Sequence, residues 1–466
     1  MNTLKKSKMK NTPVNKIIST MEELKAFYSD HQTLNINFRI GELKKFKSAI
    51  LEYEDKITEA LRADLHKSAE EAYLTEISIV IQEIDHHIGK LKKWAIPKKV
   101  RTPFHLLPSS GRIIYEPLGV ALIIAPWNFP FHLLMNPLVG AISSGCCAFL
   151  KPSPHAPATA MVMEEMVRKT FNPGHVGIAQ GGREVNKSLL AQHFDFIFFT
   201  GSPLVGQVVM KAAAENLTPV VLELGGKSPC IVEKDADIDI AAKRIAWGKT
   251  INAGQTCISP DYLFVHHSVK DDLVSRIGNQ INAMYGPDIK LSHYYPRIIH
   301  EKAVNRIQKL MQHGKIIFGG DIDIENRYIA PTIIDEVRPD YPIMQEEIFG
   351  PVLPVMTFSD IDEVISYVNA NEKPLAFYYF GKAAGTENII QKTTSGGGCI
   401  NDTILHVANH YLPFGGTGSS GMGRYHGKQS FLAFSNTRSI LKTPTYIDNP
   451  YKYPPFKNFS KLRKFV

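Results

Sequence analysis

The chain has 466 residues, of which 44% are hydrophobic and 21% are charged, so it is long enough to bury more than one hydrophobic core. Its formal net charge of +8 comes from basic residues that alternate with acidic ones except at the two ends, which argues against a nucleic-acid partner. Five cysteines, an odd number without a CxxC pair, argue against a disulfide framework and a zinc site, so we expect no metal and a reducing, cytoplasmic setting.

The first predicted elements are helices followed by a β-prone segment. Between residues 36 and 91, apolar residues recur at helical spacing with lysine and glutamate between them, which predicts amphipathic helices. Between residues 101 and 116, β-prone residues lie around a turn signal at 108–111, which predicts a hairpin.

A regular alternation of strands and helices begins at residue 120. Buried strands joined by helices are typical of a doubly wound parallel sheet, which binds ligands at the carboxyl ends of its strands. A second alternation predicts another α/β domain, and a short β-prone arm follows it. The sequence therefore predicts an α/β fold with two doubly wound domains and a small β arm. The predicted strands are 120–125, 147–150, 176–180, 194–199, 219–223, 262–265, 352–358 and 375–380, the helices include 156–169, 204–214 and 361–371, and the arm is 437–441.

Three predicted strands end close to a polar residue with chemical potential. Asn128 lies between two prolines after the first strand, where its amide can stabilise an oxyanion or merely satisfy a turn. Glu223 ends an apolar strand beside two glycines, and it is either a salt-bridged carboxylate or a general base with a raised pKa. Lys151 ends another strand and offers a fixed ammonium group at the edge where an open sheet binds its ligand.

Two loops add a thiol and a turn suited to phosphate. Cys257 lies in a loop of small residues, although a lone cysteine is more often a small buried hydrophobe than a nucleophile. Residues 201–206 lead from a strand into a helix, and the free N–H groups of such a turn suit a phosphate. The glycine pattern is not GxGxxG, so alone it is a weak signal.

Together these motifs resemble those of the aldehyde dehydrogenase superfamily. The segments PWNFP (126–130), FTGS (199–202), LELGGKSP (222–229), GQTC (254–257) and EEIFGP (346–351) occur in the family's order and approximate spacing. The resemblance extends from about residue 34 to 441, and segments such as 217–219, 259–262 and 413–427 are similar to the class 3 branch.

The resemblance implies that the chain oxidises an aldehyde to the carboxylic acid with NAD or NADP. Cys257 would be the nucleophile, Asn128 and the Cys257 backbone N–H the oxyanion hole, and Glu223 the base that hydrolyses the thioester. Within the class 3 branch, the choice between Glu223 and Glu347 as that base stays open. The residues implied in cofactor binding are Trp127, Lys151, Gly201, Ser202, Gly206, Glu347 and Phe349.

One position departs from the pattern of many NAD-preferring members. They carry a glutamate three residues after the strand-end lysine, whereas this chain has Pro154, followed by His155. A carboxylate there would bond the adenosine ribose and repel a 2′-phosphate, so its absence predicts that NADP is accepted as well as NAD.

The resemblance also leaves alternative functions to weigh. An acylating dehydrogenase would pass the thioester to coenzyme A, and such relatives generally lack the glutamate at the position of Glu223. A non-catalytic binding protein on the same scaffold is the other alternative. The class 3 branch favours medium-chain to long-chain aliphatic or aromatic aldehydes, and we expect such a substrate here.

Domain boundaries and partners complete the expectations. The hairpin and the late arm have little core of their own, so we expect them to pair across the interface of a homodimer. In the C-terminal tail, aromatic residues alternate with cations, which favours either packing on the protein or weak contact with an anionic membrane surface. We expect a cofactor-binding domain (1–100 and 117–222), a catalytic domain (223–427), an oligomerisation arm (101–116 and 428–446) and a tail (447–466).

Overall fold

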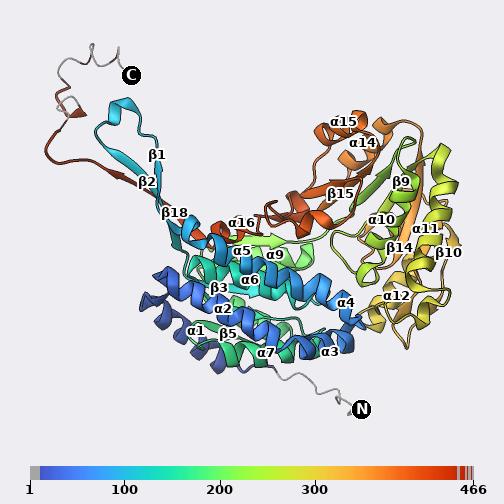
Figure 1. Ribbon diagram of the computed structural model, residues 1–466, viewed down its shortest axis with the longest axis horizontal. Coiled ribbons are helices and arrows are strands. Elements are labelled where there is room, and N and C mark those ends of the chain that lie inside the picture. The colour runs from blue at the N-terminus through green and yellow to red at the C-terminus, as the bar shows by residue number, and fades with distance from the viewer. Residues whose placement is uncertain (1–10, 449–451, 457–458, 460–462, 464–466) are drawn as a thin grey trace.

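The computed structural model describes residues 11–448, 452–456, 459 and 463 (Figure 1). The predicted tail at 447–466 therefore lies largely outside the described residues. Helices form the beginning of the described chain, which confirms the helical character predicted for 36–91. Their bounds are α1 (Val14–Ser29), α2 (Ile36–Glu52), α3 (Glu54–Leu65), α4 (Ala69–Ala72) and α5 (Ser78–Ala95).

A six-stranded sheet forms the centre of the first domain. The strand order is β17-β7-β6-β3-β4-β5, and all neighbours are parallel except β17, which runs antiparallel to β7. The chain builds β3, β4 and β5 outward and then returns to place β6 beside β3, which is the topological switch of a doubly wound sheet. The strands are β3 (Val120–Ile124), β4 (Cys147–Lys151), β5 (Val176–Ile178), β6 (Phe196–Thr200), β7 (Val220–Glu223) and β17 (Gly421–Met422).

Helices cover both faces of this sheet. Ala121 and Ile123 of β3 belong to the core that includes α5 and α6, whereas Leu122 belongs to a second core with Leu24 of α1 and Val209 of α9. Because both faces are covered, the strands are apolar without interruption, as the sequence predicted. The other helices of this domain are α6 (His132–Ser144), α7 (Pro157–Thr170), α8 (Arg183–Leu190) and α9 (Pro203–Ala214).

A seven-stranded sheet forms the second α/β domain. Its order is β10-β13-β14-β9-β8-β15-β16, with only β10 antiparallel to its neighbour. The strands are β8 (Pro229–Val232), β9 (Tyr262–His266), β10 (Lys315–Phe318), β13 (Thr332–Asp335), β14 (Val352–Phe358), β15 (Ala376–Phe380) and β16 (Gly397–Ile400). The helices are α10 (Ile238–Thr250), α11 (Lys270–Tyr285), α12 (Glu301–Leu310), α13 (Pro342–Gln345), α14 (Ile361–Ala370) and α15 (Ala383–Lys392), and a small hairpin joins β11 (Ile322–Asp323) to β12 (Tyr328–Ile329).

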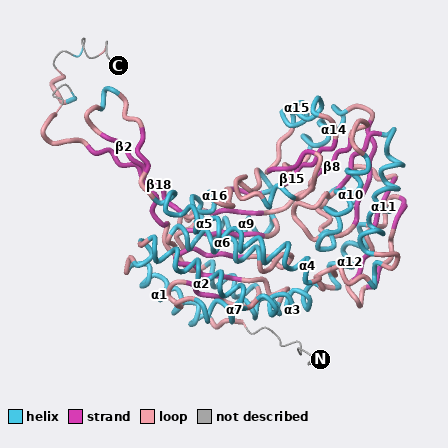
Figure 2. Tube along the Cα trace, in the orientation of Figure 1, coloured by secondary structure: helices cyan, strands magenta, loops and turns pink. Residues whose placement is uncertain are grey.

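A three-stranded arm extends away from both domains (Figure 2). β2 (Ser110–Pro117) lies between β1 (Lys98–Val100) and β18 (Ser435–Lys442) and is antiparallel to both. β1 and β2 form an antiparallel hairpin, as predicted, and their connection is residues 101–109; of the predicted turn at 108–111, Ser110 and Gly111 already belong to β2 and pair with β18. Part of the segment assigned to the arm, Lys428–Ala433, forms α16 and packs against α6. Within the described ranges, no helix is long and apolar enough to cross a membrane.

Candidate active site

Two cavities meet at Cys257. A large cavity of about 1350 Å³ lies at the carboxyl ends of β3, β4, β6 and β7, where the topology predicts a ligand. A smaller cavity of about 330 Å³ lies on the other side and is lined by residues of both domains. Cys257, Leu133 and Thr200 line both cavities. A ligand in each cavity would therefore meet the other at this thiol.

The backbone around Cys257 is held in an unusual shape. Asn252 and Ala253 have positive φ angles of 50° and 51°, and Gly254 follows with a φ of 70°. A side chain at Gly254 would place its Cβ 2.2 Å from the Gly350 carbonyl oxygen, so only glycine fits this close approach. Burial raises the pKa of the Cys257 thiol, and the carboxylates of Glu347 and Glu223 raise it further. The resting thiol is therefore neutral and needs a proton acceptor before it can attack.

Asn128 lies beside this loop, in the turn that follows β3. Its Nδ2 donates to the Gln255 carbonyl oxygen at 3.0 Å, while its own backbone oxygen accepts from Asn252 Nδ2 at 2.7 Å. The side chain is buried and lines the large cavity. Because an amide nitrogen carries two hydrogens, one donor remains for a ligand.

A buried ion pair supports the turn that carries Asn128. Lys67 and Glu76 have fully buried side chains with their charged atoms 2.6 Å apart. Lys67 Nζ also donates to the Asn128 backbone oxygen at 3.2 Å. Glu76 accepts from the backbone N–H groups of Phe131 at 2.8 Å and of His132 at 3.2 Å, at the start of α6. This pair was not predicted from the sequence, because single charges in an amphipathic helical region look like solvated surface residues.

Glu223 ends β7 and lines the small cavity. Its side chain is buried, and neither carboxylate oxygen has a hydrogen-bond partner among the described residues. Burial raises the pKa of Glu223 well above its ordinary value, and Arg424 opposes this only in part. The sequence left a salt-bridged carboxylate as an alternative, but among the described residues no cation bonds to either carboxylate oxygen of Glu223. Such a buried carboxyl group, free of other hydrogen bonds, is suited to proton transfer.

Glu347 lines the large cavity, whereas Glu223 lines the small one. Burial and the nearby Asp261 raise its pKa to about 8, although the Gly226 backbone N–H acts in the opposite direction. Gly225 leaves room for it, because a Cβ there would lie 2.4 Å from Glu347 Oε2. Arg306 fixes the segment by donating to the Glu347 carbonyl oxygen at 3.1 Å.

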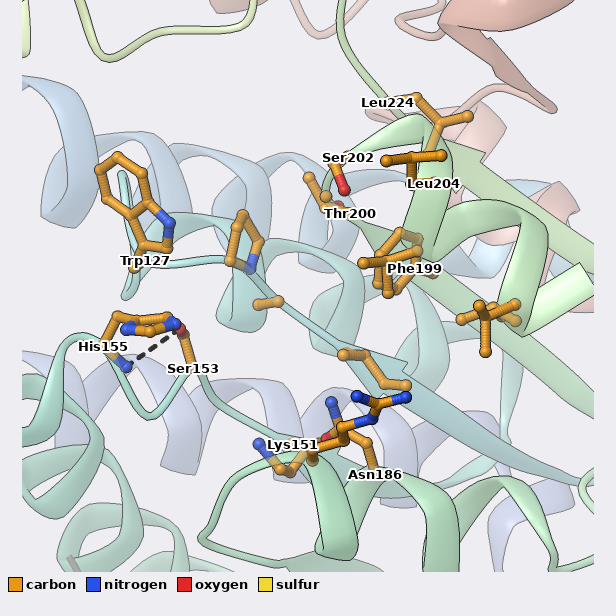
Figure 3. A pocket seen from close by; sticks show the side chains of 18 of the residues that line it. Trp127, Lys151, Ser153, His155, Asn186, Phe199, Thr200, Ser202, Leu204 and Leu224 are labelled. Atoms are coloured by element: carbon orange, nitrogen blue, oxygen red, sulfur yellow. Dashed lines mark hydrogen bonds between the residues drawn. The ribbon is translucent and has the colours of Figure 1, made fainter. Parts of the chain in front are cut away.

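The large cavity has the shape and donors for a dinucleotide. Trp127, Lys151 and Ser202 lie around it in Figure 3, and Phe349 meets Trp127 edge to face at 5.4 Å. The N-terminus of α9 follows Ser202 and offers backbone N–H groups to a phosphate. Burial lowers the pKa of Lys151 to about 8. The predicted cofactor residues that line this cavity are Trp127, Lys151, Gly201, Ser202, Glu347 and Phe349.

Gly206 is placed differently from the other predicted cofactor residues. It is buried in α9, where a Cβ would lie 2.7 Å from Leu224 Cδ2, and it does not line the cavity. Its structural role is the close approach of α9 to the segment after β7. Two further basic residues, Arg183 and Lys187, line the cavity together with Lys151 and His155 and were not predicted from the sequence. In the part of the chain that the structure describes, no group of histidine, cysteine or acidic residues is arranged to hold a metal ion.

Comparison with known proteins agrees with the geometry. The model of the aldehyde dehydrogenase family matches residues 4–440. The 4,4'-diaponeurosporen-aldehyde dehydrogenase of Staphylococcus aureus is 45% identical over 94% of this chain and 96% of that protein. A dimeric NADP-preferring aldehyde dehydrogenase of Canis lupus familiaris is 42% identical over 95% of this chain and 98% of that protein. The substrate-bound structure of Staphylococcus aureus AldH superposes with a TM-score of 0.95 at 44% identity, covering 96% of this chain and 99% of that one.

Proposed function

Because the chain belongs to the aldehyde dehydrogenase family, we propose that Cys257 is its nucleophile, with Glu223 as the base that releases the product. The chain is an oxidoreductase that oxidises aldehydes with NAD or NADP. One observation carries the assignment: Cys257 lies where the dinucleotide cavity meets a second cavity that contains a buried carboxyl group. The comparisons do not favour the acylating alternative, and the relatives named above are dehydrogenases rather than binding proteins.

The first step is attack of the thiol sulfur on the aldehyde carbon. The thiol must lose its proton, and the carboxylates of Glu223 and Glu347 can accept it, because burial raises their pKa values toward that of the thiol. The carbonyl oxygen becomes an oxyanion, which the free amide hydrogen of Asn128 and the Cys257 backbone N–H stabilise. A nicotinamide bound in the large cavity supplies an acceptor for the hydride that leaves the aldehyde carbon.

The second step is hydrolysis of the thioester on Cys257. Glu223 lines the same small cavity as the sulfur and has no competing hydrogen-bond partner among the described residues. It can therefore take a proton from the attacking water, and the carboxylic acid leaves while the thiolate regains its proton.

Pre-steady-state kinetics test the roles of the two carboxyl groups. Glu223→Gln should give a burst of NADH, or NADPH, of about one equivalent and then stall, because the thioester forms but is not hydrolysed. Glu347→Gln should slow the burst itself, since its side chain lines the cofactor cavity. If Glu347→Gln bursts and stalls while Glu223→Gln turns over normally, the roles are exchanged.

The substrate is proposed to be a medium-chain to long-chain aliphatic or aromatic aldehyde. The described residues that line the small cavity include aromatic rings but no lysine or arginine. An anionic semialdehyde would therefore lack a counter-charge. Turnover of hexanal, decanal and benzaldehyde should exceed that of succinic semialdehyde with either cofactor, and the reverse order would refute the proposal.

A homodimer is proposed on the basis of the arm. β18 is an edge strand of the arm sheet, and the described part of the chain leaves its outer edge unpaired. Long exposed edges commonly pair with another chain. The Canis lupus familiaris relative is described as dimeric. Light scattering at micromolar concentration should give twice the 52.1 kDa mass of the chain, and a monomeric mass would refute the proposal.

A cytoplasmic location is proposed from the state of the cysteines. All of them are unpaired, and a reaction that runs through a free thiol needs a reducing compartment. Cell fractionation with antibody detection tests this location, and recovery of the enzyme outside the cytoplasm would contradict it.

Weak membrane contact of the C-terminal tail is proposed separately. Tyr453, Phe456 and Phe459 are exposed. Exposed aromatic side chains beside cations bind anionic lipid surfaces in a salt-dependent way. Vesicle co-sedimentation of the full chain and of a chain ending at Pro450 should differ at low salt. Equal behaviour would remove the proposal, and loss of dimer mass in the shorter chain would indicate packing on the protein instead.

A further inference from the structure

The small cavity contains polar side chains that the proposed reaction does not use. His132 and Asn136 are four residues apart on α6 and therefore share one face of that helix. His426 lies opposite, with its ring centroid 6.4 Å from that of His132. The three side chains line the cavity and are only 5%, 1% and 3% exposed, respectively.

These side chains have unsatisfied hydrogen-bonding atoms. His132 Nε2, His426 Nε2 and both amide atoms of Asn136 have no partner among the described residues. Buried polar atoms in proteins almost always find a partner, so a group of them on one cavity wall indicates that a ligand supplies the missing bonds. Nothing in the proposed chemistry at Cys257 supplies them, because the oxyanion is held by Asn128.

The protein groups around this site favour an uncharged ligand group. Burial lowers the pKa of His132 to about 3 and also lowers that of His426, so both imidazoles are neutral. Burial acts to raise the pKa of Glu83, but His87, 3.1 Å away, and the Gly427 N–H, 2.6 Å away, outweigh it and hold that pKa at about 2. Glu83 lines the same cavity as a carboxylate, so an anionic ligand group would be repelled.

The available atoms match a hydroxyl group. A hydrogen bond to the Val407 backbone acts to raise the pKa of His426, so a ring nitrogen of His426 is the donor in that bond. This nitrogen is Nδ1, because Nε2 has no partner among the described residues. In a neutral ring the remaining nitrogen, Nε2, is then an acceptor. The Asn136 amide offers a donor and an acceptor. A hydroxyl group needs one of each.

The walls of the cavity indicate what carries the hydroxyl group. The rings of Phe129, Trp247, Phe414 and Tyr425 line it, and Phe414 stacks on His426 at 5.3 Å. We propose that the small cavity binds an aromatic aldehyde with a ring hydroxyl group, which hydrogen-bonds to Asn136, His132 and His426 while the aldehyde carbon faces Cys257. This inference rests on the proposed function and names the substrate class within it.

A matched pair of substrates tests the inference. 4-Hydroxyphenylacetaldehyde and phenylacetaldehyde differ by one hydroxyl group, and the methylene group insulates the aldehyde from its electronic effect. We expect kcat/KM to be at least about tenfold higher for the hydroxylated aldehyde, because its absence leaves buried polar groups unpaired. Asn136→Leu should reduce this ratio to about one. Both kcat/KM values come from the same enzyme preparation, so their ratio does not depend on the fraction of the variant that is folded. His132→Leu provides a second test of the same ratio.

Controls separate this inference from the proposed function. Asn282→Leu makes the same substitution on an exposed position of α11 and should leave the ratio unchanged. Equal kcat/KM for the two aldehydes in the wild-type enzyme would overturn the hydroxyl site while leaving the proposed function intact. So would a ratio that Asn136→Leu and His132→Leu do not alter. If the enzyme oxidised hexanal and decanal but neither aromatic aldehyde, the hydroxyl site alone would be refuted. Failure with all four aldehydes would refute the proposed substrate class as well.

Discussion

Replacing Lys67 with methionine should strongly destabilise the folded enzyme. The substitution removes one member of an ion pair whose two side chains are fully buried, and such a loss typically costs about 3–5 kcal/mol. Glu76 keeps the two backbone N–H donors at the start of α6, so its charge stays partly compensated. We therefore expect Lys67→Met to lower the free energy of unfolding by about 3 kcal/mol, the lower end of that range.

Replacing Glu76, the other member of the pair, should lower the free energy of unfolding by more. Glu76→Leu leaves Lys67 without its counter-charge and also strips the Phe131 and His132 N–H groups of their acceptor. Two lost hydrogen bonds at about 1 kcal/mol each place this variant near about 5 kcal/mol. The double variant Lys67→Met/Glu76→Leu should be less destabilised than Glu76→Leu alone, because no unpaired charge stays buried.

Urea unfolding monitored by circular dichroism measures these differences. Lys56→Met is the matched control, because Lys56 pairs with Glu165 at 2.8 Å but at the surface, where such pairs contribute little. If Lys67→Met shifted the unfolding midpoint no more than Lys56→Met, the buried pair would not stabilise the fold as argued. Lys67→Met should also lower kcat, because Lys67 contacts the backbone of Asn128.

Three further predictions concern the site itself. Cys257→Ala should abolish aldehyde oxidation while NADH binding, measured by fluorescence, persists; near-normal turnover would contradict the assignment of the nucleophile. Because the pKa of Glu347 is raised from 4.5 to about 8 in the folded protein, its contribution to stability is fully present below pH 4.5 and is lost as pH rises through 8. The melting temperature of the wild type relative to Glu347→Gln should fall over that window, and parallel curves would refute the shift. Pro154→Glu should reduce kcat/KM with NADP relative to NAD by at least about tenfold, because a carboxylate repels the 2′-phosphate, and an unchanged ratio would place that phosphate elsewhere.

The elements that the sequence predicted well are those with a strong local signal. The run 352–358 is β14 with the predicted bounds, because it is covered on both faces and every residue except the exposed Thr357 is apolar and buried. Asn128, Glu223 and Cys257 were found because each lies in a short motif at the end of an element. The structure brings Cys257 together with each of the other two, Asn128 at the large cavity and Glu223 at the small one.

Features that depend on distant parts of the chain were not predicted. The pairing of Ser110 with Lys442 in the arm links residues far apart in sequence, so the local turn signal at 108–111 could not show that β2 already begins at Ser110. The polar wall of the small cavity was missed for the same reason, since His132 and His426 come from segments almost 300 residues apart. The sequence around a histidine on an apolar helix does not indicate that the histidine lines a cavity.

The meeting of two cavities at one thiol has a consequence for inhibition kinetics. A molecule that fills only the small cavity competes with the aldehyde but leaves the dinucleotide cavity free, apart from the shared residues Leu133, Thr200 and Cys257. Such an inhibitor is competitive toward the aldehyde and noncompetitive toward NAD or NADP. A reagent that alkylates Cys257 modifies a residue that lines both cavities. A saturating ligand in either cavity should therefore protect the enzyme from inactivation.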